Sequence, residues 1–249
     1  MRLRLIALGC ALTGTLGLLV LPSAASAGTT GRQAPSKAPT ALSITSRATA
    51  YRYGDIVRLT VKLGPASADR AVSVYATPAG EPRMLIEAGR VSAAGTLDPE
   101  YRLTRTTTFT AVFRGDGRHA PATATRTVRT AASVAVRVAG YFRQTRIGRL
   151  PYYVFRASGT LTLHATVRPA KPGECLEPET QQYDHGIGWT SDTRYGCDAL
   201  DAVGHDTAPF TLTQAAGAKF RIRADYVHSR ADTANLSADS QWLYLTVVK

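Results

Sequence analysis

The sequence predicts an all-β protein made of two consecutive antiparallel β-sandwiches, and three observations support this fold class. Stretches of alternating apolar and polar residues recur between residues 41 and 248, and turn residues separate them at short intervals. The second half of the chain repeats the pattern of the first, and no stretch has a convincing helical period. The expected order is a signal peptide, a short flexible linker and then the two sandwiches.

Residues 1–27 have the composition and order of a secretory signal peptide. Arg2 and Arg4 precede an apolar stretch, and Ala25-Ser26-Ala27 supplies the small residues that signal peptidase accepts. A transmembrane anchor is the alternative, but the apolar stretch is short and interrupted by Gly and Thr. Because no later stretch is long and apolar enough to cross a bilayer, we expect a secreted, extracellular protein without a membrane span, either free or associated with the cell wall.

Residues 28–40 are small, polar and contain proline, which is typical of a flexible linker. The first sandwich is expected over residues 41–131. Its clearest strand is 57–63, where four apolar residues alternate with Arg58, Thr60 and Lys62, as in a strand with one buried face. Further strands are expected at 41–45, 72–76, 83–86, 101–103, 109–113 and 123–128.

The second sandwich is expected over residues 132–249, directly after the last strand of the first. The alternation at 161–167 matches that at 57–63 with an offset of 104 residues. Near the end of the repeat, superposing Tyr226 on Phe113 gives an offset of 113, so the second copy has about nine extra residues in its middle. Its last strand is expected over 241–248.

The extra residues coincide with the two cysteines that remain after signal cleavage. An even count in an exported chain predicts a disulfide between Cys175 and Cys197, which would stabilise the fold by about 3 kcal/mol. A redox pair or metal thiolates are the alternatives, but the spacing is not C-x-x-C and no second cysteine pair completes a zinc site. We expect the bridge to join neighbouring segments and to pin an insertion in the second sandwich.

Two short motifs in the first half resemble bacterial Ig-like repeats of secreted and cell-surface proteins. Tyr53-Gly54-Asp55 precedes the 57–63 strand, and an aromatic strand ending in Phe113-Arg114-Gly115-Asp116 precedes the last strand. The resemblance covers roughly residues 41–131 and is weaker in the second half, where 227–229 reads Val-His-Ser. It implies tandem Ig-like β-sandwiches with an adhesive or spacer role, and it carries over no catalytic residues.

No motif of a known catalytic site is present, and we expect a protein that is not an enzyme and needs no cofactor. Residues 174–206 are nonetheless rich in acids, which leaves three interpretations: a calcium site, paired carboxylates of a hydrolase, or solvated loops. The calcium ligand spacing is absent, no metal ligands are predicted, and the loops are preferred. The candidate binding residues in this segment are Asp184, His185, Trp189, Asp198, Asp201 and His205.

The chain is strongly basic. Its formal charge is +12 at pH 7, and removal of Arg2 and Arg4 with the signal peptide leaves +10. Such a charge favours polyanionic partners, of which an anionic cell-wall polymer is the candidate, with another extracellular protein as the alternative. A dedicated nucleic-acid ligand is not expected, because the basic residues alternate along strands and no groove-binding helix is predicted.

These observations predict a secreted, non-enzymatic binding or spacer protein that acts at the cell surface or extracellularly. Two alternatives remain: an extracellular hydrolase that uses carboxylates of 174–206, and a protein inhibitor that presents the Cys175–Cys197 loop. Two further short motifs are present. Arg114-Gly115-Asp116 fits a hairpin turn better than an integrin ligand. Asn235-Leu236-Ser237 has the pattern of a glycosylation sequon.

Overall fold

The computed structural model describes residues 36–65, 69–212 and 215–249, without the side chains of residues 191 and 192. The described residues form strands and no helix, which confirms the predicted all-β fold class. The predicted signal peptide and most of the predicted linker lie outside the described residues. At the end of that linker, Ala38 exchanges backbone hydrogen bonds with Arg118 and Ala120.

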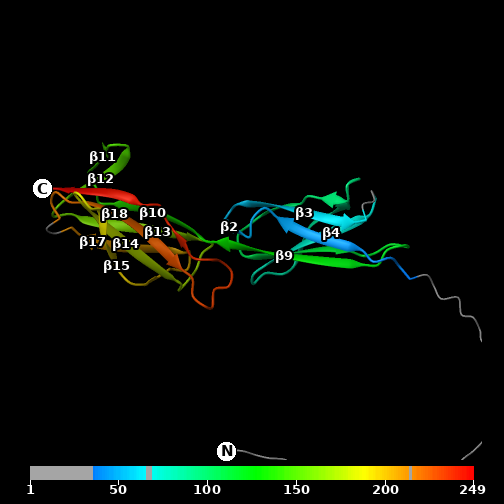
Figure 1. The fold of residues 1–249 in the computed structure, drawn as a ribbon. Helices are drawn as coiled ribbons and strands as arrows, with labels where there is room; N and C mark the ends of the chain where they lie inside the picture. Colours follow the sequence, from blue (N-terminus) through cyan, green and yellow to red (C-terminus); the bar gives the residue numbers. More distant parts are fainter. Residues whose placement is uncertain (1–35, 66–68, 213–214) are drawn as a thin grey trace, which may run out of the picture. The chain divides into compact units, whose positions relative to one another are not determined.

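The strands of the first half form one sandwich, in which Figure 1 labels β2, β3, β4 and β9. One sheet has the order β1-β3-β6 with β7 also on β3, and the other has the order β2-β9-β8-β4-β5. The bounds are β1 (Ala41–Ser46), β2 (Ala50–Arg52), β3 (Ile56–Gly64), β4 (Ala71–Pro78), β5 (Met84–Arg90), β6 (Thr96–Leu97), β7 (Glu100–Arg102), β8 (Thr107–Phe113) and β9 (Ala122–Ala131).

The second half repeats this arrangement with additional strands. Its smaller sheet has the order β10-β13-β17, and its larger sheet has the order β11-β12-β20-β18-β14-β15, with β16 on β14 and β19 on β18. The bounds are β10 (Ser133–Ala139), β11 (Arg143–Ile147), β12 (Leu150–Arg156), β13 (Thr160–Arg168), β14 (Cys175–Asp184), β15 (Gly188–Arg194), β16 (Asp198–Ala199), β17 (His205–Thr211), β18 (Lys219–Val227), β19 (Ala238–Asp239) and β20 (Leu243–Val248).

Both halves have the strand order of an immunoglobulin-type sandwich. In each half the first strand pairs with the B-type strand, β3 or β13, and the C-, F- and G-type strands lie together in the opposite sheet. In each half an early strand also runs parallel to the last strand, β2 beside β9 and β12 beside β20. The predicted Ig-like layout therefore describes the observed topology.

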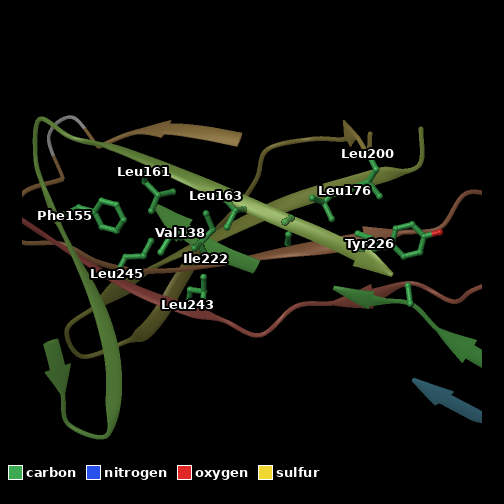
Figure 2. Packing of buried hydrophobic residues seen from close by; sticks show 14 of the residues in the cluster. Val138, Phe155, Leu161, Leu163, Leu176, Leu200, Ile222, Tyr226, Leu243 and Leu245 are labelled. Carbon is green, nitrogen blue, oxygen red and sulfur yellow. The ribbon is translucent and has the colours of Figure 1, made fainter. Parts of the chain in front are cut away.

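Each sandwich has its own apolar core. Leu59 of β3 and Leu163 of β13 are almost completely buried and lie at matching positions, since Ser46 of β1 pairs with Leu59 and Val138 of β10 pairs with Leu163. The alternation predicted for 57–63 is observed as buried and exposed residues in turn along β3. Figure 2 shows the second core, with Phe155, Leu161 and Leu245 near one end and Leu200 and Tyr226 near the other.

The second half is longer because of residues between its C-type and F-type strands. Val74 pairs with Ala111 in the first sandwich, and Pro178 pairs with Ala224 in the second, so the offset grows from 104 to 113 across this region. In this region β15 and β16 both pair with one edge of β14, and β18 pairs with the other edge. Cys175 and Cys197 form a disulfide here, with 5.1 Å between their Cα atoms.

In the part of the chain that the structure describes, no helix has the length and apolar character needed to cross a membrane.

Candidate functional site

The outer face of the larger sheet of the second sandwich carries a group of aromatic and basic side chains. Along β18, Phe220, Ile222, Ala224 and Tyr226 belong to the core. Side chains alternate between the two faces of a strand, so Lys219, Arg221 and Arg223 lie on the outer face. The register places Tyr244 of β20 and Gln181 of β14 beside Arg221 on that face.

Four aromatic rings form a continuous row across this outer face. Tyr183 contacts Trp189 with 5.3 Å between ring centroids, and Trp189 contacts Tyr244 at 5.7 Å. Tyr244 in turn contacts Tyr152 of β12 at 5.6 Å. Edge-to-face and tilted contacts at these distances are the favoured geometry for aromatic pairs. The row therefore presents a preformed aromatic surface that spans β12, β20, β14 and β15.

Arg221 lies between the chain's two tryptophans. Its guanidinium carbon is 5.0 Å from the ring centroid of Trp189 and 4.3 Å from that of Trp242. Gln181 Oε1 accepts a hydrogen bond from Arg221 Nε at 2.6 Å, which fixes the plane of the guanidinium. Arg223 also lies over Trp242, at 4.7 Å. We name this surface the aromatic–arginine face, and it consists of Tyr152, Tyr183, Trp189, Lys219, Arg221, Arg223, Trp242 and Tyr244.

Carboxylates border the aromatic–arginine face on one side. Arg223 forms ion pairs with Glu179 at 2.7 Å, with Asp225 at 3.2 Å and with Asp239 at 3.1 Å. Arg194 of β15 adds an ion pair to Glu177 at 3.2 Å. These pairs involve Arg223 and Arg194, whereas Arg221 has no ion pair among the described residues.

Desolvation raises the pKa of Asp225 to about 6, and the neighbouring carboxylates of Asp239 and Glu179 act in the same direction. Arg223 and Arg194 oppose this rise without cancelling it. Asp225 is only 4% exposed, which explains why burial dominates its titration. The acidic border is thus partly neutralised by protonation in mildly acidic surroundings.

The structure separates the six candidate binding residues of the sequence prediction. Trp189 belongs to the aromatic–arginine face, while Asp184 and His185 lie at the tip of the hairpin between β14 and β15. Asp198, Asp201 and His205 lie beyond the disulfide, near β16 and β17. Asp201 accepts backbone hydrogen bonds from Val203 and His205, and this lowers its pKa as in an ordinary turn.

The acidic side chains of residues 174–206 also lie in different parts of the second sandwich. Glu174 accepts hydrogen bonds from Ser229, Glu177 and Glu179 pair with arginines, and Asp206 points into the sandwich. Among the described residues, no group of three or more His, Cys, Asp or Glu side chains is placed to hold a metal ion.

Most of the aromatic–arginine face was missed by the sequence analysis. The alternation of Lys219, Arg221 and Arg223 with apolar residues predicts one basic face of a strand, and Trp242 and Tyr244 have the same two-residue period. The pattern could therefore have identified the two outer rows. It could not show the order β20-β18-β14-β15, which brings Trp242 and Trp189 to either side of Arg221.

Two motifs of the sequence have structural roles. The carboxylate of Asp116 accepts hydrogen bonds from the backbone N–H groups of Arg118 and His119, which together with the His119 ring lower its pKa to about 2. The Arg114-Gly115-Asp116 segment thus leads into a turn that Asp116 closes, and Gly115 has a φ of 82°. Asn235 is 2% exposed and donates to the carbonyl oxygens of Thr104 and Thr130, so this sequon offers no accessible amide in the folded chain.

No protein-family model matches the sequence, and no curated protein matches it. Similar solved structures include a tetra-tandem repeat from the extending region of a large adhesion protein, with 13% identity, a TM-score of 0.38 and coverage of 82% of this chain and 49% of that one. The D0–D1 domain of intimin has 11% identity, a TM-score of 0.29 and coverage of 83% and 97%. Trypsin-activated alpha-2-macroglobulin from Escherichia coli has 9% identity, a TM-score of 0.35 and coverage of 84% and 16%.

The chain thus spans about half the length of the adhesion-protein repeat that it matches. None of these similarities bears on what this chain binds. The class of protein is defined by the fold itself, two tandem Ig-like sandwiches, and by the aromatic–arginine face of the second.

Proposed function

We propose that this protein is an exported, non-enzymatic binding protein that attaches to an acidic polysaccharide of the cell wall through the aromatic–arginine face. The observation that carries the proposal is the position of Arg221 between Trp189 and Trp242. The first sandwich then acts mainly as a spacer. Export is supported by the composition of residues 1–27 and by the Cys175–Cys197 disulfide, which is typical of oxidising compartments.

An acidic glycan matches the two kinds of group on this face. Aromatic side chains present a large apolar surface with a polar edge, on which the apolar face of a sugar ring can stack. The planar guanidinium of Arg221 offers fixed N–H donors that suit a carboxylate or a phosphate, and its stacking on the indoles holds it in place. The net positive charge of the chain adds long-range attraction to a polyanion.

The proposal is tested by co-sedimentation of the secreted protein with insoluble forms of three polymers. Polygalacturonate offers sugar rings with carboxylates, dextran offers rings without charge, and polyphosphate offers charge without rings. We expect the tightest binding to polygalacturonate, and we expect added salt to weaken it because screening shortens the reach of the attraction. Equal binding to polyphosphate would show that charge alone is recognised and would contradict the proposal.

The matched variants are Arg221→Ala in the second sandwich and Arg83→Ala in the first. Arg83 stacks on Tyr75 at 3.7 Å, so it is also an arginine in a cation–π contact, but it lies outside the aromatic–arginine face. We expect Arg221→Ala to raise the dissociation constant for polygalacturonate roughly tenfold, the size of a moderate hot-spot residue. Arg83→Ala removes the same charge and should leave the affinity nearly unchanged.

No specific observation on the described residues favours a hydrolase or an inhibitor over this function. The co-sedimentation experiment also addresses the inhibitor hypothesis, since that hypothesis assigns binding to the Cys175–Cys197 loop. If removal of the disulfide abolished polymer binding in a folded protein while Arg221→Ala did not, the loop would be the contact surface and the proposal would fail.

A further inference from the structure

A second site lies inside the second sandwich, away from the aromatic–arginine face. A cavity of about 620 Å³ opens between β17, at the edge of the smaller sheet, and β14 of the larger sheet. Volumes of this size are typical of small-molecule sites. Its floor consists of apolar side chains of the core, among them Phe155, Leu161, Phe220, Leu245 and Val247. Figure 2 shows Phe155, Leu161 and Leu245 near the same end of that core.

An aspartate projects from β17 toward this interior. Asp206, Ala208 and Phe210 pair with Ala165, Leu163 and Leu161 of β13, all of which are buried in the core. Residues that face each other across an antiparallel pair lie on the same side of the sheet. The carboxyl group of Asp206 is therefore on the inner side of the sheet, where an apolar residue is the ordinary occupant.

The carboxyl group of Asp206 has an unsatisfied oxygen. Oδ2 is buried and has no hydrogen-bond partner among the described residues. Burial raises the pKa of this carboxyl, and the nearby carboxylates of Asp198 and Asp201 raise it further. A buried acceptor without a donor is costly, so the site gains free energy from any ligand that brings a donor or a positive charge.

The charges around the cavity have one sign. Asp198 and Asp206 line it, and none of the described lining residues is Lys, Arg or His, although the chain as a whole has 30 Lys and Arg against 18 Asp and Glu. An acidic cavity in a basic protein disfavours anions. The charge and the apolar floor together favour a ligand with an apolar body and a cationic end.

Two aromatic side chains lie at this cavity. Tyr195, which follows β15, meets Phe210 of β17 edge to face with 4.8 Å between ring centroids. The hydroxyl groups of Tyr195 and Thr180 are 3.1 Å apart, which ties the ring to β14. These contacts join the two sheets beside the cavity and give it an aromatic wall.

We propose that this cavity binds a small cationic amphiphile, with the alkyl or ring portion on the Phe155–Leu161–Leu245 floor and an ammonium or guanidinium group against Asp206 and Asp198. This site is separate from the proposed polysaccharide face, because it opens between the sheets, whereas the aromatic–arginine face is on the outside of one sheet.

The experiment titrates the isotope-labelled secreted protein with n-decylamine, n-decanol and n-decanoate below their micelle concentrations, and follows backbone amide shifts by NMR. We expect decylamine to shift the amides of β17 and to bind at least tenfold more tightly than decanol, with decanoate weakest. Equal affinity for the three probes, or shifts confined to other parts of the chain, would overturn the proposal.

Three variants identify the side chains that give the cavity its preference for the amine. Asp206→Asn keeps the side-chain shape and removes the charge, so it should abolish the preference for the amine and leave decanol binding unchanged. Asp198→Asn is the second variant if the first does not fold, and it should reduce the preference in the same direction. Arg221→Ala should leave all three affinities unchanged, which distinguishes this site from the polysaccharide face. An unaltered preference in both aspartate variants would refute the assigned role of the carboxylates.

Discussion

Arg221 and Asp225 lie four residues apart on the same face of β18, and their surroundings give them opposite roles. Arg221 stacks between two indoles and has a hydrogen bond to Gln181, so its charge is held at the surface. Asp225 is buried at the border, where its charge costs free energy in spite of the arginines beside it. The surroundings of each charged side chain thus determine whether its charge is stabilised on this sheet.

The titration of Asp225 gives a prediction with a defined sign. Its pKa is raised from 3.8 to about 6 in the folded chain, so the unfolded chain ionises first as the pH rises. Asp225 therefore lowers the free energy of unfolding progressively between about pH 4 and pH 6, by at most about 3 kcal/mol in all. In Asp225→Asn the asparagine side chain does not titrate, so the free energy of unfolding of this variant should rise relative to that of the wild type over that range.

The measurement is denaturant unfolding of both proteins at pH 4, 5, 6 and 7. The difference between Asp225→Asn and the wild type should grow with pH and become constant above the folded pKa. A difference that does not change with pH would mean that Asp225 titrates normally and that burial does not control it.

Trp189 and Asp206 show what the sequence could and could not indicate at this scale. The sequence indicates Trp189 because this residue lies in an unusual polar segment, and in the structure Trp189 belongs to the aromatic–arginine face. The sequence does not distinguish Asp206, which is one acid among many in a loop-like segment. Only the pairing of β17 with β13 shows that it points inward, and that pairing joins residues about 40 positions apart in the chain.

Among the structural elements, β16 and the disulfide beside it distinguish the second sandwich from the first, because β14 and β15 take the places of β4 and β5. Cys175 begins β14 and Cys197 precedes β16, which pairs with the start of β14. The disulfide thus connects adjacent segments, as the sequence predicts from their short separation. Because the bridge closes a loop between residues 22 positions apart, it restricts the unfolded chain more than the folded one.

The double variant Cys175→Ser/Cys197→Ser should lower the free energy of unfolding of the second sandwich by about 2–4 kcal/mol. Thermal unfolding of the oxidised wild type, the reduced wild type and the double variant checks this. The reduced wild type is the control, since it should resemble the variant. Identical midpoints for all three samples would argue against a stabilising bridge.

Some elements could be predicted from sequence and others could not. Strands with a buried and a solvated face, such as β3, β8 and β13, show a clear two-residue period and were predicted close to their observed bounds. The period fails for β14 and β17, because each contains a proline and carries polar side chains on both faces. Very short strands such as β6 and β16 have too few residues for any period.

On the scale of the whole molecule, the chain is built by repeating one sandwich and enlarging the second copy. Leu59 and Leu163 occupy the same place in the two cores, and both are almost fully buried. The first core comprises residues between Ile44 and Val128, whereas the second comprises residues between Ala132 and Val247. Each core is thus assembled from one continuous stretch of chain.

Two matched variants test this independence. Leu59→Ala and Leu163→Ala remove the same part of a leucine side chain from equivalent core positions. Each should lower the free energy of unfolding of its own sandwich by about 2–5 kcal/mol. Hydrogen exchange followed separately in the two halves measures the effect. We expect protection to fall only in the mutated half, and a loss of protection in both halves with either variant would show that the two cores unfold as one unit.

The central claim is that the aromatic–arginine face binds an acidic polysaccharide. The chain contains only two tryptophans, Trp189 and Trp242, and both flank Arg221. Their indole N–H groups therefore give two NMR signals that report directly on this face. When soluble oligogalacturonate is added to the isotope-labelled protein, both indole signals should shift in a saturable manner, and Arg221→Ala should weaken the response. Saturable binding that leaves both indole signals unmoved would contradict the account.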